Sequence, residues 1–336
     1  MFLVAFGGTW LMQKGTALLK IQKIPASELT LEGFKHQYQT LGIPVIITGL
    51  IPTDWDWSLE YLCEQLGNQE FVLRYYGNQR YQQDKRKWTS IGSGVTPKSQ
   101  PFLEYAELLR QRVAHTQDIY LAKCSIAHTP LLQTQAIDTV SRYLNAIGLC
   151  QPASALNLWV GPSGHVECLH YDPTDGTLIQ LHGAKRVILF PPSQTANLYP
   201  YSIFVHLRYG LKLRSWFSQV YPDRPDFQAF PKFRQALQYR QEIILNQGEI
   251  LYIPAGWWHE VTALVNEMSD EMSDEMVCSV NRFWQVYPTQ RAICSWARWR
   301  AYLGSLCAVP NLTVSTVMAL FSQDRKRKLK EIRQMF

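Results

Sequence analysis

The sequence lacks several features of exported, membrane-spanning or disulfide-stabilised proteins. Its seven cysteines are scattered and include no C-x-x-C pair, so neither a disulfide framework nor a cysteine zinc site is predicted. The apolar residues 1–12 are too few to span a bilayer, and no positive residues precede them as in a secretory signal. No other uninterrupted apolar run approaches ~20 residues. We therefore expect a cytoplasmic protein that does not enter a membrane.

What the sequence does contain is enough for a large buried core. Its 336 residues are 46% hydrophobic and 12% aromatic, and the formal net charge of +6 permits contact with nucleic acid without requiring it. Part of that charge lies in a basic cluster at 325–333, which is typical of a solvated helix end. A tandem EMSD repeat at 267–276 falls between two predicted strands and indicates an exposed acidic loop.

The first third of the chain is predicted to alternate helices with short strands. Apolar spacing predicts helices at 22–42, 55–66 and 101–113 and strands at 44–50, 71–76 and 118–122. Ser27 and Thr30 are candidate caps of the first helix. The stretch 74–88 interleaves aromatic residues with Arg and Lys, which suits either a surface hairpin or stacking on RNA bases.

From about residue 155 the pattern changes to short apolar runs separated by Gly, Pro and Ser turns. Many short strands at close spacing predict an antiparallel sandwich or barrel, and hence a mainly β fold with flanking helices. The long segment 193–240 interrupts these strands, and we place the substrate entrance near it because such connections are often functional. Beyond residue 288 two helical runs follow, which we expect to cover the barrel or to form a homodimer contact.

Three residues have the types and spacing of a metal site. His170 and Asp172 are two positions apart, so on a strand they would project from the same face. An isolated H-x-D also occurs on strands by chance, and His259, after a Pro-Ala-Gly bend, supplies the third ligand that strengthens the prediction. Two histidines and one carboxylate leave an open face on the ion, as a non-haem Fe(II) centre requires, although zinc accepts similar ligands.

Together with Lys185 in GAKRVILFPP and His259 in IPAGWWHEV, this motif resembles the cupin-like Jumonji-C family of Fe(II)- and 2-oxoglutarate-dependent oxygenases. Within it, the sequence is most similar to the branch of the asparaginyl hydroxylase that acts on hypoxia-inducible factor. The similarity runs from about Pro44 to Trp284, through PVIITGL, DIYLA, GPSG and SVNRFW.

The resemblance implies a double-stranded β-helix, the jelly-roll barrel of cupins, with helical N-terminal additions. The barrel core would lie at about 118–286, within a cupin-like Jumonji-C domain at 22–290. An apolar leader at 1–21 would precede this domain, and C-terminal helices with the basic tail at 291–336 would follow it.

The resemblance also assigns roles to individual residues. His170, Asp172 and His259 would bind Fe(II) and form the catalytic centre, where 2-oxoglutarate would chelate the metal through its 2-oxo acid end. The far carboxylate of 2-oxoglutarate would pair with Lys185, since a buried cation offsets the hydration that a dianion loses. Tyr120 would donate its hydroxyl to the same carboxylate. Two further residues are expected near the metal and the co-substrate: Asn281 and Trp159.

Two positions depart from the related enzymes. Glu167 and Cys168 stand where these enzymes commonly have Thr-Pro, and Gly176 replaces a polar residue that helps to hold the co-substrate. A Glu167 carboxylate that points inward would either repel 2-oxoglutarate or pair with Lys185, and both would weaken co-substrate binding.

The resemblance predicts a dioxygenase that uses O2 and 2-oxoglutarate to hydroxylate a side chain of a protein or peptide substrate, with succinate and CO2 as co-products. A second hypothesis is oxidation of a modified tRNA base, which the stretch 74–88 and the basic tail would suit. A third, motivated by Glu167, is a cupin-fold metal-binding protein without turnover. Histone demethylation is less attractive, because no reader module or zinc cluster is recognisable beside the barrel.

Overall fold

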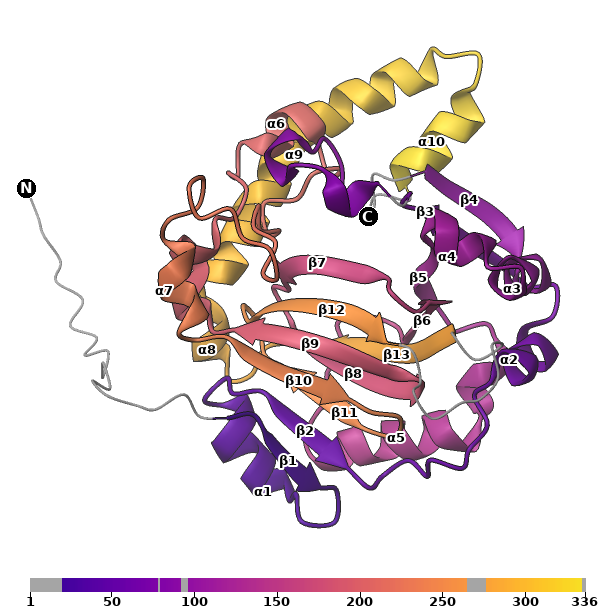
Figure 1. The fold of residues 1–336 in the computed structure, drawn as a ribbon, viewed down its shortest axis with the longest axis vertical. Coiled ribbons are helices and arrows are strands. Elements are labelled where there is room, and N and C mark those ends of the chain that lie inside the picture. Colours follow the sequence, from indigo (N-terminus) through magenta and orange to yellow (C-terminus); the bar gives the residue numbers. More distant parts are fainter. Residues whose placement is uncertain (1–19, 78, 92–95, 265–275, 334–336) are drawn as a thin grey trace, which may run out of the picture.

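Two facing β-sheets form the centre of the molecule in the computed structural model, which describes residues 20–77, 79–91, 96–264 and 276–333 (Figure 1). The larger sheet has nine strands in the spatial order β1-β2-β11-β8-β13-β6-β5-β3-β4, and the smaller has four in the order β10-β9-β12-β7. Neighbouring strands are antiparallel except for β1 and β2, which are parallel. The predicted mainly β fold, a jelly-roll barrel with flanking helices, is confirmed.

The larger sheet consists of β1 (Gln22–Pro25), β2 (Val45–Thr48), β3 (Glu70–Tyr75), β4 (Thr96–Pro101), β5 (Ile119–Ser125), β6 (Asn157–Pro162), β8 (Asp175–His182), β11 (Ile250–Ile253) and β13 (Met276–Trp284). The smaller sheet consists of β7 (Val166–Tyr171), β9 (Ala184–Phe190), β10 (Gln241–Leu245) and β12 (Trp258–Leu264). The helices are α1 (Leu31–Phe34), α2 (Leu59–Leu66), α3 (Phe102–Arg110), α4 (Val113–Gln117), α5 (Gln135–Ala146), α6 (Val205–Tyr209), α7 (Phe233–Leu237), α8 (Thr289–Cys294), α9 (Trp296–Leu320) and α10 (Arg325–Arg333).

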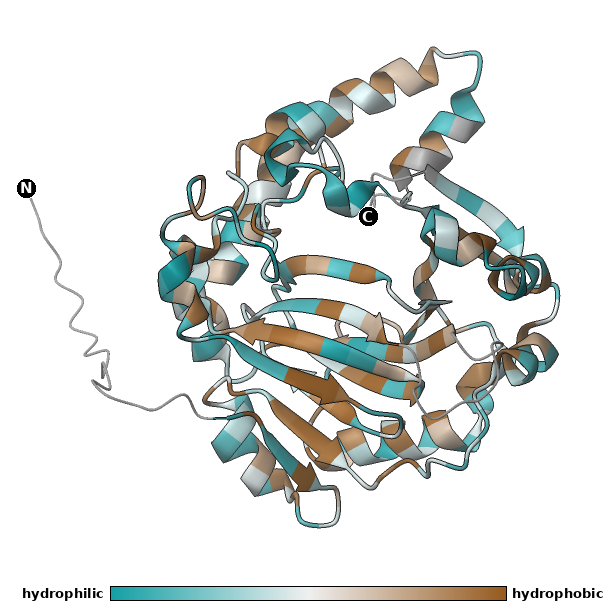
Figure 2. Ribbon diagram, in the orientation of Figure 1, coloured by the Kyte–Doolittle hydropathy of each residue, from teal (hydrophilic) through white to brown (hydrophobic). Residues whose placement is uncertain are grey.

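The main hydrophobic core lies between the larger sheet and the N-terminal helices. Ile47, Ile179 and Ile250 come from three neighbouring strands and are fully buried in the same cluster as Phe34 of α1 and Leu62 of α2. Burial of each such side chain contributes about 1.5–3 kcal/mol. Figure 2 shows hydrophobic residues concentrated on the central strands. This core packs the larger sheet against the N-terminal helices.

The N-terminal predictions need two corrections. The helix expected at 22–42 is preceded by strand β1 and begins at Leu31, where Thr30 caps it by accepting a hydrogen bond from the Gly33 amide at 3.1 Å. The helix expected at 55–66 begins only at Leu59 because Ser58 caps it. Pairing of β1 with β2 outweighs the local helical pattern. It provides hydrogen-bond partners for backbone N–H and C=O groups of β2, which would otherwise lie at the edge of the sheet.

The basic and aromatic stretch 74–88 is not a surface hairpin. After β3 it forms two short helical turns, Arg80–Gln82 and Lys85–Lys87. Arg80 lies over the Tyr76 ring at 4.3 Å and is 7% exposed, while Lys85 is 1% exposed and donates to the Val220 carbonyl at 2.9 Å. These two cations are therefore used in packing, and the structure does not support a nucleic-acid surface here.

The C-terminal region contains one long helix where the sequence predicted two helical runs. α9 continues through Pro310, and Gly304 packs it against His206 of α6, where an added Cβ would lie 2.8 Å from Nε2. Residues 301–320 carry no charged side chain, although Ser, Thr and Asn interrupt the apolar run. α9 is long and apolar enough for a membrane span by length and composition alone, which is weak evidence for one.

Two predicted features fall outside the part of the chain that the structure describes. These are the apolar leader, apart from its last two residues, and the EMSD repeat up to residue 275.

Candidate metal centre

The three predicted metal ligands come together at one end of the smaller sheet. His170 on β7 and His259 on β12 are direct partners in the antiparallel register, and their ring centres lie 4.3 Å apart. Asp172 lies just beyond the end of β7, and its Oδ2 is 3.6 Å from His259 Nε2. One donor atom from each residue falls within 4.8 Å of the others, so the cluster could hold a metal ion.

Hydrogen bonds to the main chain fix the orientation of the two imidazoles. His170 Nδ1 lies 2.8 Å from the Cys168 carbonyl, and His259 Nδ1 lies 3.0 Å from the Trp257 carbonyl. A carbonyl accepts from a protonated nitrogen, so each Nε2 is left with a lone pair for a metal. On the other side of His170, the Phe217 ring stacks at 4.8 Å.

The protonation state of His259 also suits metal binding. Burial, together with the neighbouring His170, lowers the pKa of His259 to about 4. The imidazole is therefore neutral at physiological pH, which is the form that binds metal.

The main chain of Asp172 is fixed by a neighbouring turn. The Gly256 amide donates a hydrogen bond to the Asp172 carbonyl at 2.9 Å, and Gly256 adopts a φ of +84° in that turn. A residue with a Cβ is strained at that φ.

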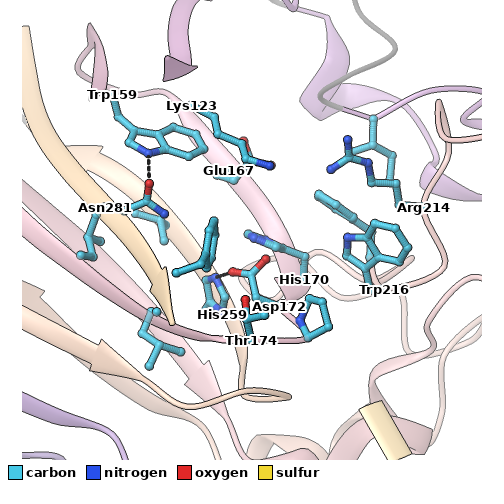
Figure 3. A pocket seen from close by; sticks show the side chains of 18 of the residues that line it. Lys123, Trp159, Glu167, His170, Asp172, Thr174, Arg214, Trp216, His259 and Asn281 are labelled. Atoms are coloured by element: carbon cyan, nitrogen blue, oxygen red, sulfur yellow. Dashed lines mark hydrogen bonds and ion pairs between the residues drawn. The ribbon is translucent and has the colours of Figure 1, made fainter. Parts of the chain in front are cut away.

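A cavity of about 540 Å³ opens next to the three ligands, and all seven residues predicted for the site line it (Figure 3). Lys185 on β9 is 3% exposed and donates to Ser279 Oγ on β13 at 2.5 Å, so this bond links the two sheets. Burial lowers the pKa of Lys185 to about 8. Trp159 Nε1 donates to Asn281 Oδ1 at 2.8 Å on the opposite wall, as Figure 3 shows.

Tyr120 on β5 is held between two specific neighbours. Its ring stacks on the His165 imidazole at 3.8 Å with an interplanar angle of 10°. On its other side lies Gly161, where an added Cβ would be 1.9 Å from Tyr120 Cδ2. His165 Nδ1 in turn lies 2.6 Å from Asp118 Oδ1. Tyr120 therefore reaches the cavity because position 161 has no side chain.

Comparison with known proteins identifies the family. The sequence model of the cupin-like domain family matches residues 31–290, which is most of the chain. The chain belongs to the cupin-like domain family.

Curated relatives agree with this assignment and carry Jumonji-C names. JmjC domain-containing protein D of Dictyostelium discoideum is 28% identical over 277 residues, covering 77% of this chain and 56% of the relative. Lysine-specific demethylase JMJ30 of Arabidopsis thaliana is 30% identical over 256 residues, covering 72% and 52%. Lysine-specific demethylase 8 of Xenopus tropicalis is 29% identical over 244 residues, covering 70% and 48%. The chain spans about half the length of these relatives, and the narrower resemblance to the asparaginyl hydroxylase branch is not confirmed.

The cavity of this cupin-like protein fits the cofactors of the Jumonji-C enzymes, Fe(II) and 2-oxoglutarate. The donor set is two imidazole nitrogens and a carboxylate, which suits a ferrous ion. Lys185 provides a buried ammonium group that has a neutral hydroxyl as its hydrogen-bond partner. A carboxylate at this position would give that charge an anionic partner in a desolvated site. The roles of Lys185, Tyr120, Asn281 and Trp159 towards 2-oxoglutarate remain predictions.

Glu167 points into the cavity (Figure 3). Regular alternation would place it on the opposite face from His170, but a β-bulge gives β7 one extra residue between the two, because His259 pairs with His170 and Val261 with Glu167. Its Oε2 is buried without a hydrogen-bond partner in the described part of the chain. Burial raises the pKa of Glu167, but the nearby His170, Arg80, His165 and Arg74 together hold it below its ordinary value. The carboxylate is therefore ionised and also interacts with the Lys185 ammonium group.

Sequence reasoning missed several residues that line this cavity. They are Arg74, Lys123, His165, Arg214, Trp216 and Phe217. His165 directly follows the GPSG turn that supported the resemblance and begins the predicted strand HVECLHY, so its position was a usable signal. Arg214, Trp216 and Phe217 belong to the segment 193–240, where only the approximate position of the entrance was predicted.

Proposed function

We propose that this chain is an Fe(II)- and 2-oxoglutarate-dependent dioxygenase that hydroxylates a side chain of a protein substrate. The observation that carries the proposal is the His170, Asp172 and His259 cluster in the same cavity as a buried lysine. His170, Asp172 and His259 would hold the metal, and Lys185 would bind the far carboxylate of 2-oxoglutarate. Bound Fe(II) and 2-oxoglutarate would supply the oxidising chemistry, with succinate and CO2 as co-products.

The protein itself would orient the reactants and exclude water. Lys185 fixes one end of the co-substrate, while the main-chain hydrogen bonds of His170 and His259 keep both imidazoles directed at the metal. Phe217 shields one face of His170 with its ring. Such positioning limits unproductive oxidation, because the reacting C–H bond is held next to the metal before turnover.

The test is anaerobic loading with Fe(II), followed by measurement of 2-oxoglutarate binding and of uncoupled succinate formation after admission of O2. We expect one iron per chain, saturable binding and slow succinate release. With a peptide substrate, mass spectrometry should detect the gain of one oxygen atom; loss of a methyl group would indicate demethylation instead. Stoichiometric iron without binding or succinate would overturn the proposal.

A metal-binding protein without turnover is the second candidate, and Glu167 favours it. An ionised carboxylate beside Lys185 competes with 2-oxoglutarate for the same cation. The same assay separates the two candidates, because this one predicts iron binding alone. Oxidation of a tRNA base is less attractive, since Arg80 and Lys85 are buried.

A homodimer contact through α8 to α10 and a cytoplasmic location stay predictions. Sedimentation analysis and cell fractionation test them.

A further inference from the structure

The cavity carries more positive charge than the proposed cofactors neutralise. Among the described residues, four cationic side chains and two carboxylates line it. The cations are Arg74, Lys123, Lys185 and Arg214, and the carboxylates are Glu167 and Asp172. A divalent metal ion adds two positive charges, and dianionic 2-oxoglutarate offsets two. With these cofactors bound, the described lining residues would give the cavity a net charge of +2, and a second anionic ligand would balance it.

Three of these cations form one wall, which we call the cationic wall and define as Arg74, Lys123 and Arg214. Arg74 on β3 pairs with Tyr120 of β5 in the register and therefore shares its cavity-facing side. Lys123 would face away from Tyr120 if β5 alternated regularly. A β-bulge between Leu121 and Cys124, with Lys123 at φ of +56°, turns its side chain into the cavity as well.

Arg214 completes the wall from the long segment 193–240. Its side chain and that of Lys123 extend towards the space above His170 and Asp172, from opposite sides (Figure 3). Surrounding protein lowers the pKa of Lys123, and Arg214 lowers it further. Burial lowers the pKa of Arg214 and Arg74 lowers it further, while Glu167 and Asp172 raise it.

A cluster of like charges destabilises the fold unless an anion binds between them. The ammonium of Lys123 lies 5.9 Å from the centre of the Phe283 ring, and no carboxylate among the described residues is within ion-pair distance of it. Such a wall repels a cationic side chain. A lysine substrate, as the names of two relatives indicate for those proteins, would meet like charge here.

We infer that the cavity selects a protein substrate whose reacting residue is acidic, an aspartate or glutamate whose carboxylate binds to Lys123 and Arg214. This inference rests on the proposed function for its chemistry. One oxygen atom of O2 would enter a C–H bond of that residue as hydroxyl, the other would enter succinate, and CO2 would leave from 2-oxoglutarate. The carboxylate is not consumed; it positions the C–H bond beside the metal.

The test compares peptide libraries with identical random neutral flanks and one fixed central residue: aspartate, asparagine or dimethyl-lysine. Full-length protein with Fe(II), 2-oxoglutarate and O2 is assayed for succinate above the uncoupled rate and for oxygen insertion by mass spectrometry. The aspartate library should exceed the asparagine library about tenfold, because a charge-assisted contact with two cations is stronger than a neutral one. Equal rates, or a higher rate with dimethyl-lysine, would overturn the inference.

Two charge-removing variants assign the preference to the cationic wall. Lys123→Met and Arg214→Met should each reduce the aspartate preference to less than about threefold. The difference in aspartate preference between the wild-type protein and each variant should become smaller in high salt, because salt screens the charges. The matched control is Lys212→Met, which removes one positive charge from an exposed position that does not line the cavity. It should keep the full preference. Thermal unfolding checks that each variant is folded, and we expect Tm to rise slightly as repulsion is relieved.

A binding measurement separates failure of this inference from failure of the proposed function. Dye-labelled aspartate and asparagine libraries are titrated anaerobically into Zn(II)-loaded protein with 2-oxoglutarate, and anisotropy is followed. A preference of about tenfold for aspartate without any succinate formation would retain the acidic ligand and overturn the dioxygenase. Uncoupled succinate formation without an aspartate preference in either assay would retain the dioxygenase and overturn the acidic substrate.

Discussion

The two ends of the cavity hold positive charge in different ways. At one end, which we call the closed end because Lys185 there is 3% exposed, this lysine is a single cation on a regular strand. One hydrogen bond to Ser279 links it to the other sheet. At the opposite wall, Arg74, Lys123 and Arg214 come from an outer strand, a β-bulge and a long connection. The first arrangement follows from strand register. The second depends on irregular backbone.

This difference suggests how one barrel serves several substrates. Register fixes Lys185 relative to His259, because β9 and β12 are neighbours and residues 185 and 263 are direct partners. Any chain that forms this barrel with a lysine at this position keeps that geometry. A bulge or a long connection can change without disturbing the sheets, so the cationic wall can differ while the metal site stays.

The largest expected effect is the loss of iron binding when two of the metal ligands are replaced. The double variant His170→Ala, Asp172→Ala should weaken the affinity for iron by more than ~100-fold, because it deletes two of the three ligands. Loss of a residue that only hydrogen-bonds to a ligand typically weakens metal affinity 10–100-fold. Iron content after anaerobic loading and desalting measures this. Lys212→Met is the control and should keep one iron per chain. Stoichiometric iron in the double variant would show that other residues bind the metal.

The next effect distinguishes the two ends directly. Lys185→Met should raise the KM for 2-oxoglutarate about 100-fold, since a buried carboxylate would lose its cationic partner. Lys123→Met makes the same chemical change at the cationic wall. Its increase in the KM for 2-oxoglutarate should be at least thirtyfold smaller than the increase caused by Lys185→Met. Uncoupled succinate formation at varied 2-oxoglutarate measures both. Similar increases in the two variants would mean that the co-substrate contacts both ends, and the comparison would fail.

The sequence was most informative where structure is regular. Strand alternation predicted that His170 and Asp172 act as a pair. His259 was predicted from its motif further along the chain and Lys185 from the family resemblance, and both lie on strands whose register brings them to the site. The barrel itself was predicted from its short apolar runs. Asp172 lies beyond the end of β7, yet it still reaches the metal position because the Gly256 amide holds its carbonyl.

The cationic wall could not be predicted for a physical reason. Lys123 comes directly after the strand predicted at 118–122 and belongs to the longer observed strand β5. Regular alternation would place its side chain and that of Tyr120 on opposite faces, and only the bulge brings them to the same side. Arg214 lies in a segment without a period of its own. Arg80 and Lys85 show the opposite kind of error. The local pattern predicted that these two cations lie at the surface, but tertiary packing buries them.

A smaller effect of opposite sign comes from Glu167, which interacts with both ends. Its ionised carboxylate lies near Lys185 and is stabilised by Arg74 of the cationic wall. Glu167→Gln should lower the Kd of 2-oxoglutarate about tenfold, because a like charge next to the co-substrate carboxylate is removed. Calorimetry on Zn(II)-loaded protein measures this. An unchanged Kd would show that Glu167 acts at the cationic wall alone. A higher Kd would show that Glu167 helps to bind the co-substrate.

The smallest expected effect is a pH dependence confined to the closed end. The pKa of Lys185 is lowered to about 8, and lysine carries its charge below its pKa, so the cation is present at pH 7 and is lost as the pH rises through 8. The charged fraction falls about tenfold between pH 7 and pH 9, and the KM for 2-oxoglutarate should rise by no more than that, since the neutral amine still donates a hydrogen bond. Lys185→Arg should abolish the rise, because a guanidinium stays charged. A rise that persists in Lys185→Arg would assign the titration to another group, and Lys123 at the cationic wall would be the next residue to vary.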